Sequence, residues 1–155
     1  KLEILKDPHC GAFAVIRLCT YFLAYFCLAF CIRFSPRVGL CWTLALVLER
    51  GLSGLAVAAF PMAKNTGLAH TFATAADRES VQKILIVLSV LLAAALIALG
   101  GGALVAVALL VLWRYHHVAV KEFGGITGDL AGWFLQKAEF WMLAALAASQ
   151  WGGIL

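Results

Sequence analysis

Charged side chains are scarce in this chain. They make up 13% of its 155 residues, while hydrophobic residues make up 64% and the mean hydropathy is +0.97. An average soluble domain has about 25% charged and roughly 45–50% apolar residues. A chain this short cannot bury so much apolar surface in a water-soluble core. The composition therefore excludes an ordinary soluble protein and predicts an all-α, polytopic helical membrane protein.

Signs of a second domain are also absent. The chain has no linker, no run of like charges, no low-complexity segment and no repeat at a fixed period. These absences predict a single membrane domain over residues 1–155. The formal net charge of +4 requires no nucleic-acid partner, because basic residues concentrated on one side of a membrane account for it.

Cysteine is absent after residue 41. Cys27 and Cys31 are spaced i, i+4 and could face a common partner on a helix. Thiols alone on one helix do not make a zinc site, however. We interpret the cysteines as small apolar residues of membrane helices. They are Cys10, Cys19, Cys27, Cys31 and Cys41.

The chain also lacks an initiator methionine and a signal peptide. It begins at Lys1, and residues 1–6 resemble the middle of a helix rather than its start. We therefore expect a fragment of a longer protein whose N-terminal part is missing.

Apolar runs dominate the rest of the sequence. A bilayer core of about 30 Å needs about 20 apolar residues in a helix. Residues 81–113 are too long for one crossing and are broken only by glycines at 100, 101 and 102. We expect a break there, although a single helix is the alternative. The sequence then predicts about five transmembrane helices, at residues 11–32, 38–60, 80–99, 103–121 and 129–149.

The basic residues give an orientation. Five crossings put Arg33 and Arg37 on one side and most other basic residues on the opposite side. Lysine and arginine concentrate on the cytoplasmic side of membrane proteins. We therefore expect a multi-pass protein of the cell (inner) membrane whose active face is cytoplasmic. That face would carry Lys1, Lys6, Lys64, Arg78, Lys83, Arg114 and Lys121.

The most distinctive stretch is FGGITGDLAGWFLQKAE, residues 123–139. Its glycines permit positive φ, and Asp129 follows in the first turn of a helix, where backbone N–H groups lack partners. Polar residues within an apolar span are costly in lipid and favour a functional site. One face of this helix would carry Asp129, Gly132, Gln136 and Glu139, and the other Leu130, Trp133, Phe134, Lys137 and Trp141.

A second polar feature is the pair Glu49 and Arg50, at the middle of the predicted second crossing. Each charge at mid-span costs about 2.5–3.5 kcal/mol on insertion scales. Adjacent residues point about 100° apart on a helix, so we expect these two to pair poorly with each other. Each is then expected to have a partner elsewhere, such as a polar cavity.

These residue types suggest phosphate chemistry in one pocket at the inner leaflet. Carboxylates at a glycine-rich turn can hold Mg²⁺, which favours one or two carboxylates plus phosphate oxygens. Cations neutralise phosphate charge, and phosphoryl transfer needs chiefly positioning and charge neutralisation. The competing class is a non-enzymatic transporter or assembly subunit, although no internal repeat is visible. The candidate residues are Asp7, Asp129 and Glu139 with Lys6, Arg50, Lys64 and Arg78.

Three segments resemble the cobalamin synthase family: LEILKDPHCGAF (2–13), LERGLSGLAVAAFPMAKNTGLA (48–69) and FGGITGDLAGWFLQKAE (123–139). The GGITGD block is the most specific of them. The resemblance implies a magnesium-dependent membrane enzyme that joins adenosylcobinamide-GDP to α-ribazole or its 5′-phosphate and releases GMP, in the last steps of coenzyme B12 assembly. A CDP-alcohol phosphotransferase, which shares Mg²⁺ chemistry but lacks this block, is the alternative enzyme.

Matches to the family's motifs give candidate roles to individual residues. Lys6, Asp7 and Gly11 match a turn of the family, Arg50 matches an arginine of a middle span, and Asp129 belongs to the GGxTGD block. The resemblance implies catalytic roles for Asp129, Asp7 and Arg50, substrate binding by Lys6, Lys64, Gly125 and Gly128, and Mg²⁺ binding by Asp129 and Glu139.

The sequence departs from the family's pattern in places. His9 and Lys64 stand where arginine is common, and lysine lacks the bidentate geometry of arginine. Gln136 stands where a glutamate is common. The family also has an aspartate-rich segment, which would precede Lys1, so we expect this chain alone to bind Mg²⁺ poorly and to turn over no substrate. Membrane lipid is a further expected partner, and the sequence allows a homo-oligomer.

Overall fold

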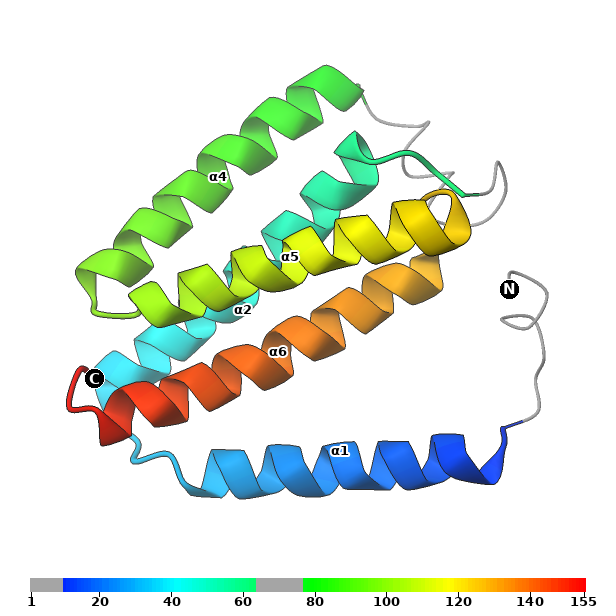
Figure 1. The fold of residues 1–155 in the computed structure, drawn as a ribbon. Helices are drawn as coiled ribbons and strands as arrows, with labels where there is room; N and C mark the ends of the chain where they lie inside the picture. The colour runs from blue at the N-terminus through cyan, green and yellow to red at the C-terminus, as the bar shows by residue number, and fades with distance from the viewer. Residues whose placement is uncertain (1–9, 64–76) are drawn as a thin grey trace.

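The computed structural model describes residues 10–63 and 77–155, and this part of the chain is all-helical (Figure 1). The helices are α1 (Ala12–Phe30), α2 (Pro36–Ala59), α4 (Arg78–Ala98), α5 (Gly102–Phe123) and α6 (Gly128–Trp151). Each of the five predicted spans is confirmed as one helix, with ends that differ by no more than two residues. The predicted site residues Lys6, Asp7 and Lys64 lie outside the described residues.

Four of these helices, α1, α2, α4 and α5, are long and apolar enough to cross a membrane. The chain is therefore a multi-pass membrane protein. The helix α6 matches α2 in length, at 24 residues, but it carries Asp129, Lys137 and Glu139 in its first half and is not among the four. Its crossing of the membrane stays a prediction.

Serine, proline and glycine set the helix boundaries. Ser35 caps α2, because its Oγ accepts a hydrogen bond from the N–H of Val38 at 3.2 Å, and Pro36 supplies a φ that suits the first helical position. Between α4 and α5, Gly100 has a φ of 86°, which glycine adopts without steric cost. The chain reverses at the three glycines, so residues 80–121 form two helices and not one.

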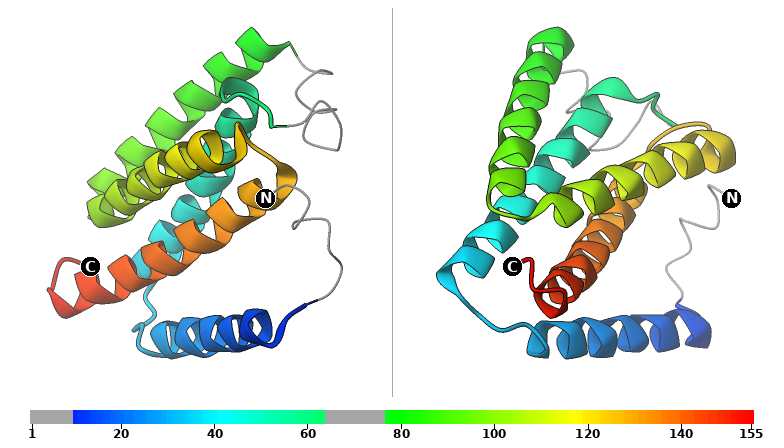
Figure 2. Two further views of the ribbon diagram at one scale, coloured as in Figure 1. Left: turned by 45° about the vertical axis from the view of Figure 1, so that its right-hand side comes forward. Right: turned by 60° about the vertical axis from the view of Figure 1, so that its left-hand side comes forward.

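The helix α2 packs against α4, α5 and α6, as the different views show (Figures 1 and 2). Its buried face, which includes Leu48 and Leu52, belongs to the same hydrophobic core as Tyr115 of α5 and Phe134 of α6. Tyr115 of α5 stacks on Phe134 of α6, with ring centroids 5.2 Å apart. Both rings are fully buried, so the core lies where α2, α5 and α6 meet.

The first helix lies along one side of this bundle, next to α6 (Figure 2). None of its residues is buried. Its aromatic contact with α6 joins Tyr21 and Phe140, whose ring centroids are 5.8 Å apart. A helix that is hydrophobic all round suits contact with lipid.

The two ends of the bundle are distinct. At one end, the side chain of Gln150 exchanges two hydrogen bonds with the backbone of Arg33, at 3.0 and 2.7 Å, and Nε of Arg37 donates to the carbonyl of Leu99 at 2.9 Å. The turn at residues 124–127 lies at the other end, between α5 and α6. Arg33 and Arg37 therefore lie opposite this turn, as the five-span topology predicts. Which membrane side each end faces stays a prediction.

Candidate functional site

A glycine turn joins α5 to α6. Gly124 ends α5 in the left-handed conformation, with a φ of 73°, and its N–H donates to the carbonyl of Val120 at 3.1 Å. Thr127 then caps α6, because its hydroxyl accepts a hydrogen bond from the N–H of Leu130 at 3.3 Å. The turn is thus fixed by the helices on both sides of it.

The same turn is also bound to the segment that follows α2. The N–H of Ile126 donates to the carbonyl of Pro61 at 2.8 Å, and the N–H of Ala63 donates to the carbonyl of Ile126 at 3.0 Å. A Cβ on Gly125 would lie 2.5 Å from the Pro61 oxygen and 2.6 Å from the Ala63 nitrogen. Only glycine lets these two backbones approach. Gly125 therefore has a structural task, and its contact with substrate stays a prediction.

The first turns of α6 form one wall of an open hollow of about 590 Å³. The predicted polar face of α6 lies along this hollow, and Arg50 reaches it from α2. The two predicted catalytic residues within the described part of the chain, Arg50 and Asp129, therefore open on the same space. The hollow is lined by Arg50, Gly128, Asp129, Gly132, Trp133, Leu135, Gln136 and Glu139.

Trp133 lies at the border between the two predicted faces of α6. It was predicted on the face opposite Asp129, together with Leu130 and Phe134, which are indeed buried in the core. Trp133 also forms part of the wall of the hollow, because it follows Asp129 by one helical turn, at i+4. The hollow also stays open beside Gly128, where an added Cβ would meet no atom within 4 Å.

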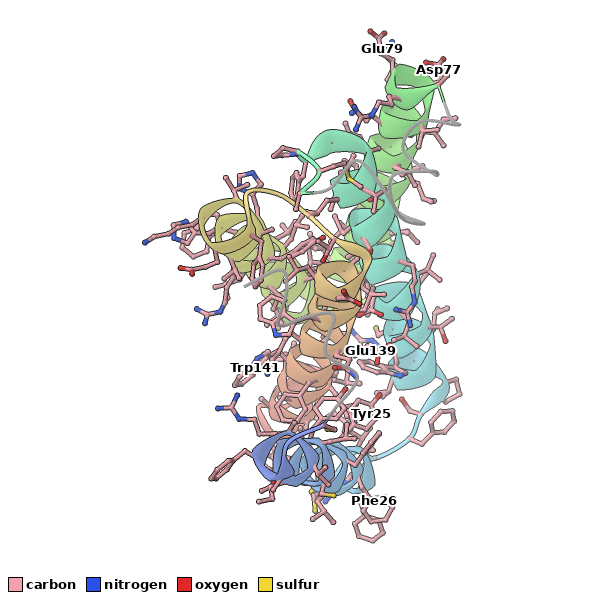
Figure 3. The ribbon with its side chains drawn as sticks, turned by 90° about the vertical axis from the view of Figure 1, so that its right-hand side faces the viewer. Tyr25, Phe26, Asp77, Glu79, Glu139 and Trp141 are labelled. Atoms are coloured by element: carbon pink, nitrogen blue, oxygen red, sulfur yellow. The ribbon has the colours of Figure 1, made fainter. Side chains whose placement is uncertain are left out.

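Arg50 bridges two helices through its guanidinium. Nη2 lies 2.9 Å from Oε1 of Glu139, and Nη1 lies 3.2 Å from Oε1 of Glu49. The predicted partner elsewhere in the chain is thus confirmed for Arg50. The expectation that Glu49 and Arg50 pair poorly is wrong, because the long arginine side chain turns back to its neighbour although the two Cα–Cβ bonds diverge. Figure 3 shows Glu139 beside the bundle interior, whereas Asp77 and Glu79 project from the tip of α4.

Glu49 is the residue that sequence reasoning left out of the site. Its side chain is 0% exposed, and neither of its oxygens has a hydrogen-bond partner within residues 10–63 and 77–155. Within those residues, the ion pair with Arg50 therefore compensates the charge of Glu49. The signal that could have found it is its position next to an arginine at mid-span. Arg50 remains 55% exposed, and its guanidinium has five N–H donors, so it can still bind an anion in the hollow.

The two predicted Mg²⁺ ligands cannot share one ion. Asp129 and Glu139 are ten residues apart on α6, which is about 15 Å along the helix axis, and Mg²⁺ binds its ligands at about 2.1 Å. Glu139 is bound to Arg50, whereas Asp129 is exposed at the hollow. Asp129 therefore fits a Mg²⁺ ligand that acts together with phosphate oxygens. Within the described ranges, no three His, Cys, Asp or Glu side chains form a group that could hold a metal.

Other predicted residues lie away from the hollow or cannot be placed. Arg78 begins α4 and is not part of the wall of the hollow. Lys6, Asp7 and Lys64 are outside the described residues. The structure thus brings together Arg50, Gly128, Asp129 and Glu139, with Gly125 in the preceding turn.

Sequence comparisons relate the chain to known proteins. The sequence profile of the family described as cobalamin-5-phosphate synthase matches residues 1–147. The chain is similar to the adenosylcobinamide-GDP ribazoletransferases of Lachnoclostridium phytofermentans (40% identity over 95% of this chain), Desulforamulus reducens (29% over 97%) and Pseudomonas putida strain GB-1 (31% over 94%). It spans 56%, 59% and 58% of the length of these relatives. No solved structure matches the chain.

Proposed function

Because the chain belongs to the cobalamin-5-phosphate synthase family, we propose that it forms part of an adenosylcobinamide-GDP ribazoletransferase. Such an enzyme joins the cobinamide phosphate of adenosylcobinamide-GDP to α-ribazole or its 5′-phosphate and releases GMP. The chain spans 56% of the length of the relative from L. phytofermentans. The activity is therefore proposed for the full-length protein that contains the chain.

One observation carries this proposal beyond the family match: Arg50 and Asp129 line the same hollow although they are far apart in the sequence. A cation and a carboxylate beside a glycine turn suit a diphosphate substrate, because arginine can bind phosphate oxygens bidentately. The volume of about 590 Å³ lies within the roughly 300–1,000 Å³ typical of small-molecule pockets.

In the proposed reaction, a hydroxyl of ribazole attacks the phosphorus attached to cobinamide. A new P–O bond forms, the bond between the two phosphates breaks, and GMP leaves with the bonding electrons while the hydroxyl proton passes to solvent or a base. Arg50 would neutralise charge on the diphosphate with the donors that Glu49 and Glu139 do not occupy. Asp129 would hold Mg²⁺, whose chemistry when bound is to stabilise charge on the phosphate oxygens.

We further propose that the hollow faces the cytoplasm. Lys83 and Lys121, near the start of α4 and the end of α5, lie toward the same end of the bundle as the turn at 124–127. Arg33 and Arg37 lie at the other end. Basic residues favour the cytoplasmic side, and a guanosine diphosphate derivative is a soluble, charged substrate.

The test replaces Asp129 by asparagine in the full-length protein reconstituted in lipid vesicles. We expect GMP release from adenosylcobinamide-GDP and α-ribazole to fall by about 100- to 1,000-fold, the effect of removing one charge-stabilising group from an active site. Asp77→Asn is the matched control, because Asp77 is an exposed carboxylate at the start of α4, outside the hollow. Its turnover should match that of the unmodified protein.

Two results would contradict parts of this proposal. Full turnover by the Asp129→Asn variant, inserted normally in the membrane, would remove Asp129 from the site. Absence of GMP release by the unmodified full-length protein, with Mg²⁺ and both substrates present, would overturn the proposed activity itself.

A further inference from the structure

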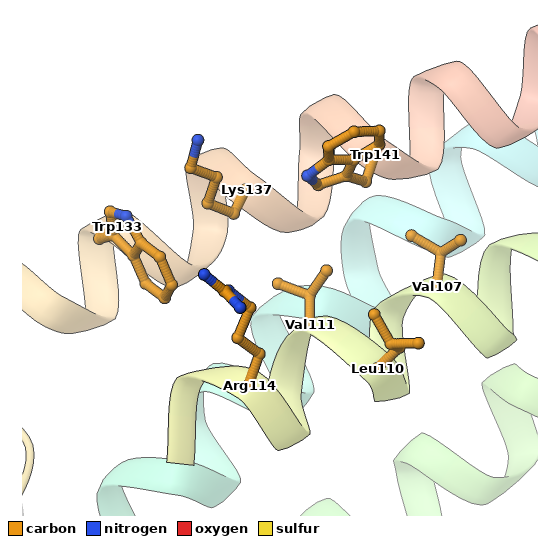
Figure 4. A pocket seen from close by; sticks show the side chains of 7 residues that line it. All are labelled: Val107, Leu110, Val111, Arg114, Trp133, Lys137 and Trp141. Carbon is orange, nitrogen blue, oxygen red and sulfur yellow. The ribbon is translucent and has the colours of Figure 1, made fainter. Parts of the chain in front are cut away.

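A second concave surface lies between α5 and α6. It is a groove of about 500 Å³ on the outside of the bundle (Figure 4). Aliphatic side chains of α5, among them Leu110 and Val111, form its floor, and α6 contributes Trp133 and Trp141. Leu110 and Trp141 are 63% and 52% exposed, so the groove opens toward the surroundings of the bundle. Trp133 forms part of the wall of both this groove and the hollow beside Asp129.

Two cations occupy this mainly apolar groove at the same level. Arg114 lies nine residues before the end of α5, and Lys137 lies nine residues after the start of α6. Both are therefore about 13 Å along their helices from the turn that joins them. Figure 4 shows Arg114 reaching from α5 toward α6, where Lys137 stands between Trp133 and Trp141.

These cations have no counter-ion in the described part of the chain. The ion pairs there involve Arg50 and Lys83, and neither Arg114 nor Lys137 takes part in one. The carboxylate of α6 closest in sequence, Glu139, is bound to Arg50. Two uncompensated like charges along membrane helices are unfavourable. The pair is therefore complementary to an anion that residues 10–63 and 77–155 do not supply.

The surroundings of the cations select the kind of anion. Trp133 and Trp141 flank them, and each indole combines a large apolar body with an N–H donor. Lysine and arginine extend their charged ends toward the headgroups while their aliphatic stems stay in apolar surroundings. Basic pockets between membrane helices bind anionic headgroups. A soluble phosphate would leave the aliphatic floor of the groove exposed, whereas an acyl chain would cover it.

We propose that the groove binds an anionic phospholipid, such as phosphatidylglycerol. Its phosphate contacts Arg114 and Lys137, and one acyl chain lies along Val111 and Trp141. This lipid site is independent of the proposed transferase activity, because its formation requires neither Asp129 nor a substrate. It is therefore tested by lipid binding alone.

The experiment uses the full-length protein in phosphatidylcholine vesicles that contain a minor fraction of brominated phosphatidylglycerol. Bromine quenches tryptophan fluorescence, and Trp133 and Trp141, two of the chain's five tryptophans, contribute the part of the quenching that reports on lipid in the groove. We expect brominated phosphatidylglycerol to be enriched roughly ten- to thirtyfold over brominated phosphatidylcholine, as two cations acting together on one anionic headgroup would give. Trp141→Phe should lower the quenching that is specific for the anionic lipid.

Two charge-altering variants sharpen the test. Arg114→Gln/Lys137→Gln should reduce the enrichment to about one, the value expected when neither cation of the groove remains. Lys83→Gln/Lys121→Gln removes the same charge outside the groove and should keep the enrichment. The exchange Arg114→Lys/Lys137→Arg preserves both charges and should also keep it.

Three results would overturn the proposal. The first is equal quenching of the unmodified protein by brominated phosphatidylglycerol and brominated phosphatidylcholine, which decides the matter even if the glutamine variant fails to fold. The second is undiminished enrichment in a folded Arg114→Gln/Lys137→Gln variant. The third is displacement of the brominated lipid by soluble glycerol phosphate at the same concentration, because the acyl chain would then contribute nothing to binding.

Discussion

Arg50 joins two carboxylates that lie on different helices. Glu49 precedes it on α2, and Glu139 belongs to α6. Glu49 is completely buried, so its charge depends on the guanidinium at 3.2 Å. Removing one partner of a buried ion pair leaves an uncompensated charge, which is more costly than the loss of the attraction itself. Arg50 is therefore expected to matter for stability as well as for substrate.

Replacing Arg50 by glutamine should lower the free energy of unfolding by about 1–3 kcal/mol, because the buried Glu49 would then lack its counter-ion. The double variant Glu49→Gln/Arg50→Gln should recover most of that loss, since a neutral amide needs no cation. The measurement is reversible denaturation in detergent micelles, followed by tryptophan fluorescence.

The exposed ion pair of Lys83 and Glu79 is the control for the comparison of Arg50→Gln with Glu49→Gln/Arg50→Gln. Its atoms are 3.6 Å apart and both side chains are largely exposed, so Lys83→Gln should cost less than about 1 kcal/mol. If Glu49→Gln/Arg50→Gln lost as much free energy of unfolding as the two single variants together, Arg50 would not be the counter-ion of Glu49.

For individual residues, the sequence predicted which side chains share a helix face better than it predicted which side chains contact one another. The spacing of Asp129, Gly132 and Gln136 gave their common face, because helical periodicity is a property of the backbone. The ion pair of Glu49 and Arg50 was missed, because the reach of a long side chain is not set by the direction of its Cα–Cβ bond. The contact between Arg50 and Glu139 depends on how α2 packs against α6, which no local pattern encodes.

Glycine governs how the helical elements meet. Gly125 and Gly128 belong to the same motif, yet their surroundings differ. An added Cβ on Gly125 would meet the backbone of residues 61–63, whereas one on Gly128 would meet nothing within 4 Å. The first glycine therefore permits the approach of two chain segments, and the second leaves space open beside the hollow.

Gly125→Ala should destabilise the fold by roughly 1–3 kcal/mol, the usual cost of forcing extra atoms into a packed site. The φ of 153° at this position is also unfavourable for alanine. Gly128→Ala should leave stability unchanged or raise it by up to about 1 kcal/mol, since alanine favours a helix over glycine. Denaturation midpoints of the two variants provide the comparison. Equal midpoints would show that residues 61–63 do not constrain the turn.

The helical elements themselves were largely predictable. Apolar runs bounded by Ser35–Pro36, by the glycines at 100–102 and by the 124–128 turn gave helix ends within two residues. These boundaries are local, because caps and positive φ angles act on their own neighbours. The backbone pairing of Ile126 with Pro61 and Ala63 was not predictable, since it joins segments that carry no strand pattern.

The whole molecule has one end marked by Arg33 and Arg37 and another marked by the glycine turn. Labelling with a membrane-impermeant maleimide tests whether these ends lie on opposite membrane sides. In a protein whose native cysteines are replaced by alanine, Phe34→Cys should react from outside the cell, and Lys121→Cys should react only after the membrane is opened. The physical reason is the preference of lysine and arginine for the cytoplasmic side.

Reaction of both cysteines from the same side would contradict the proposed orientation and would require another number of crossings. Ala103→Cys, in the first turn of α5 near the Gly100 reversal, provides an internal control. It should react from the same side as Phe34→Cys, because Arg37 holds the carbonyl of Leu99 at 2.9 Å.

The double pairing of Arg50 has a consequence for biosynthesis. Glu139 follows Arg50 by 89 residues in the chain. The ribosome has therefore delivered α2 to the translocon long before α6 is synthesised. During that interval the adjacent Glu49 can already neutralise the guanidinium of Arg50, which lowers the free-energy cost of inserting α2 into the bilayer. Arrival of α6 then adds a second carboxylate to an ion pair that has already formed within α2.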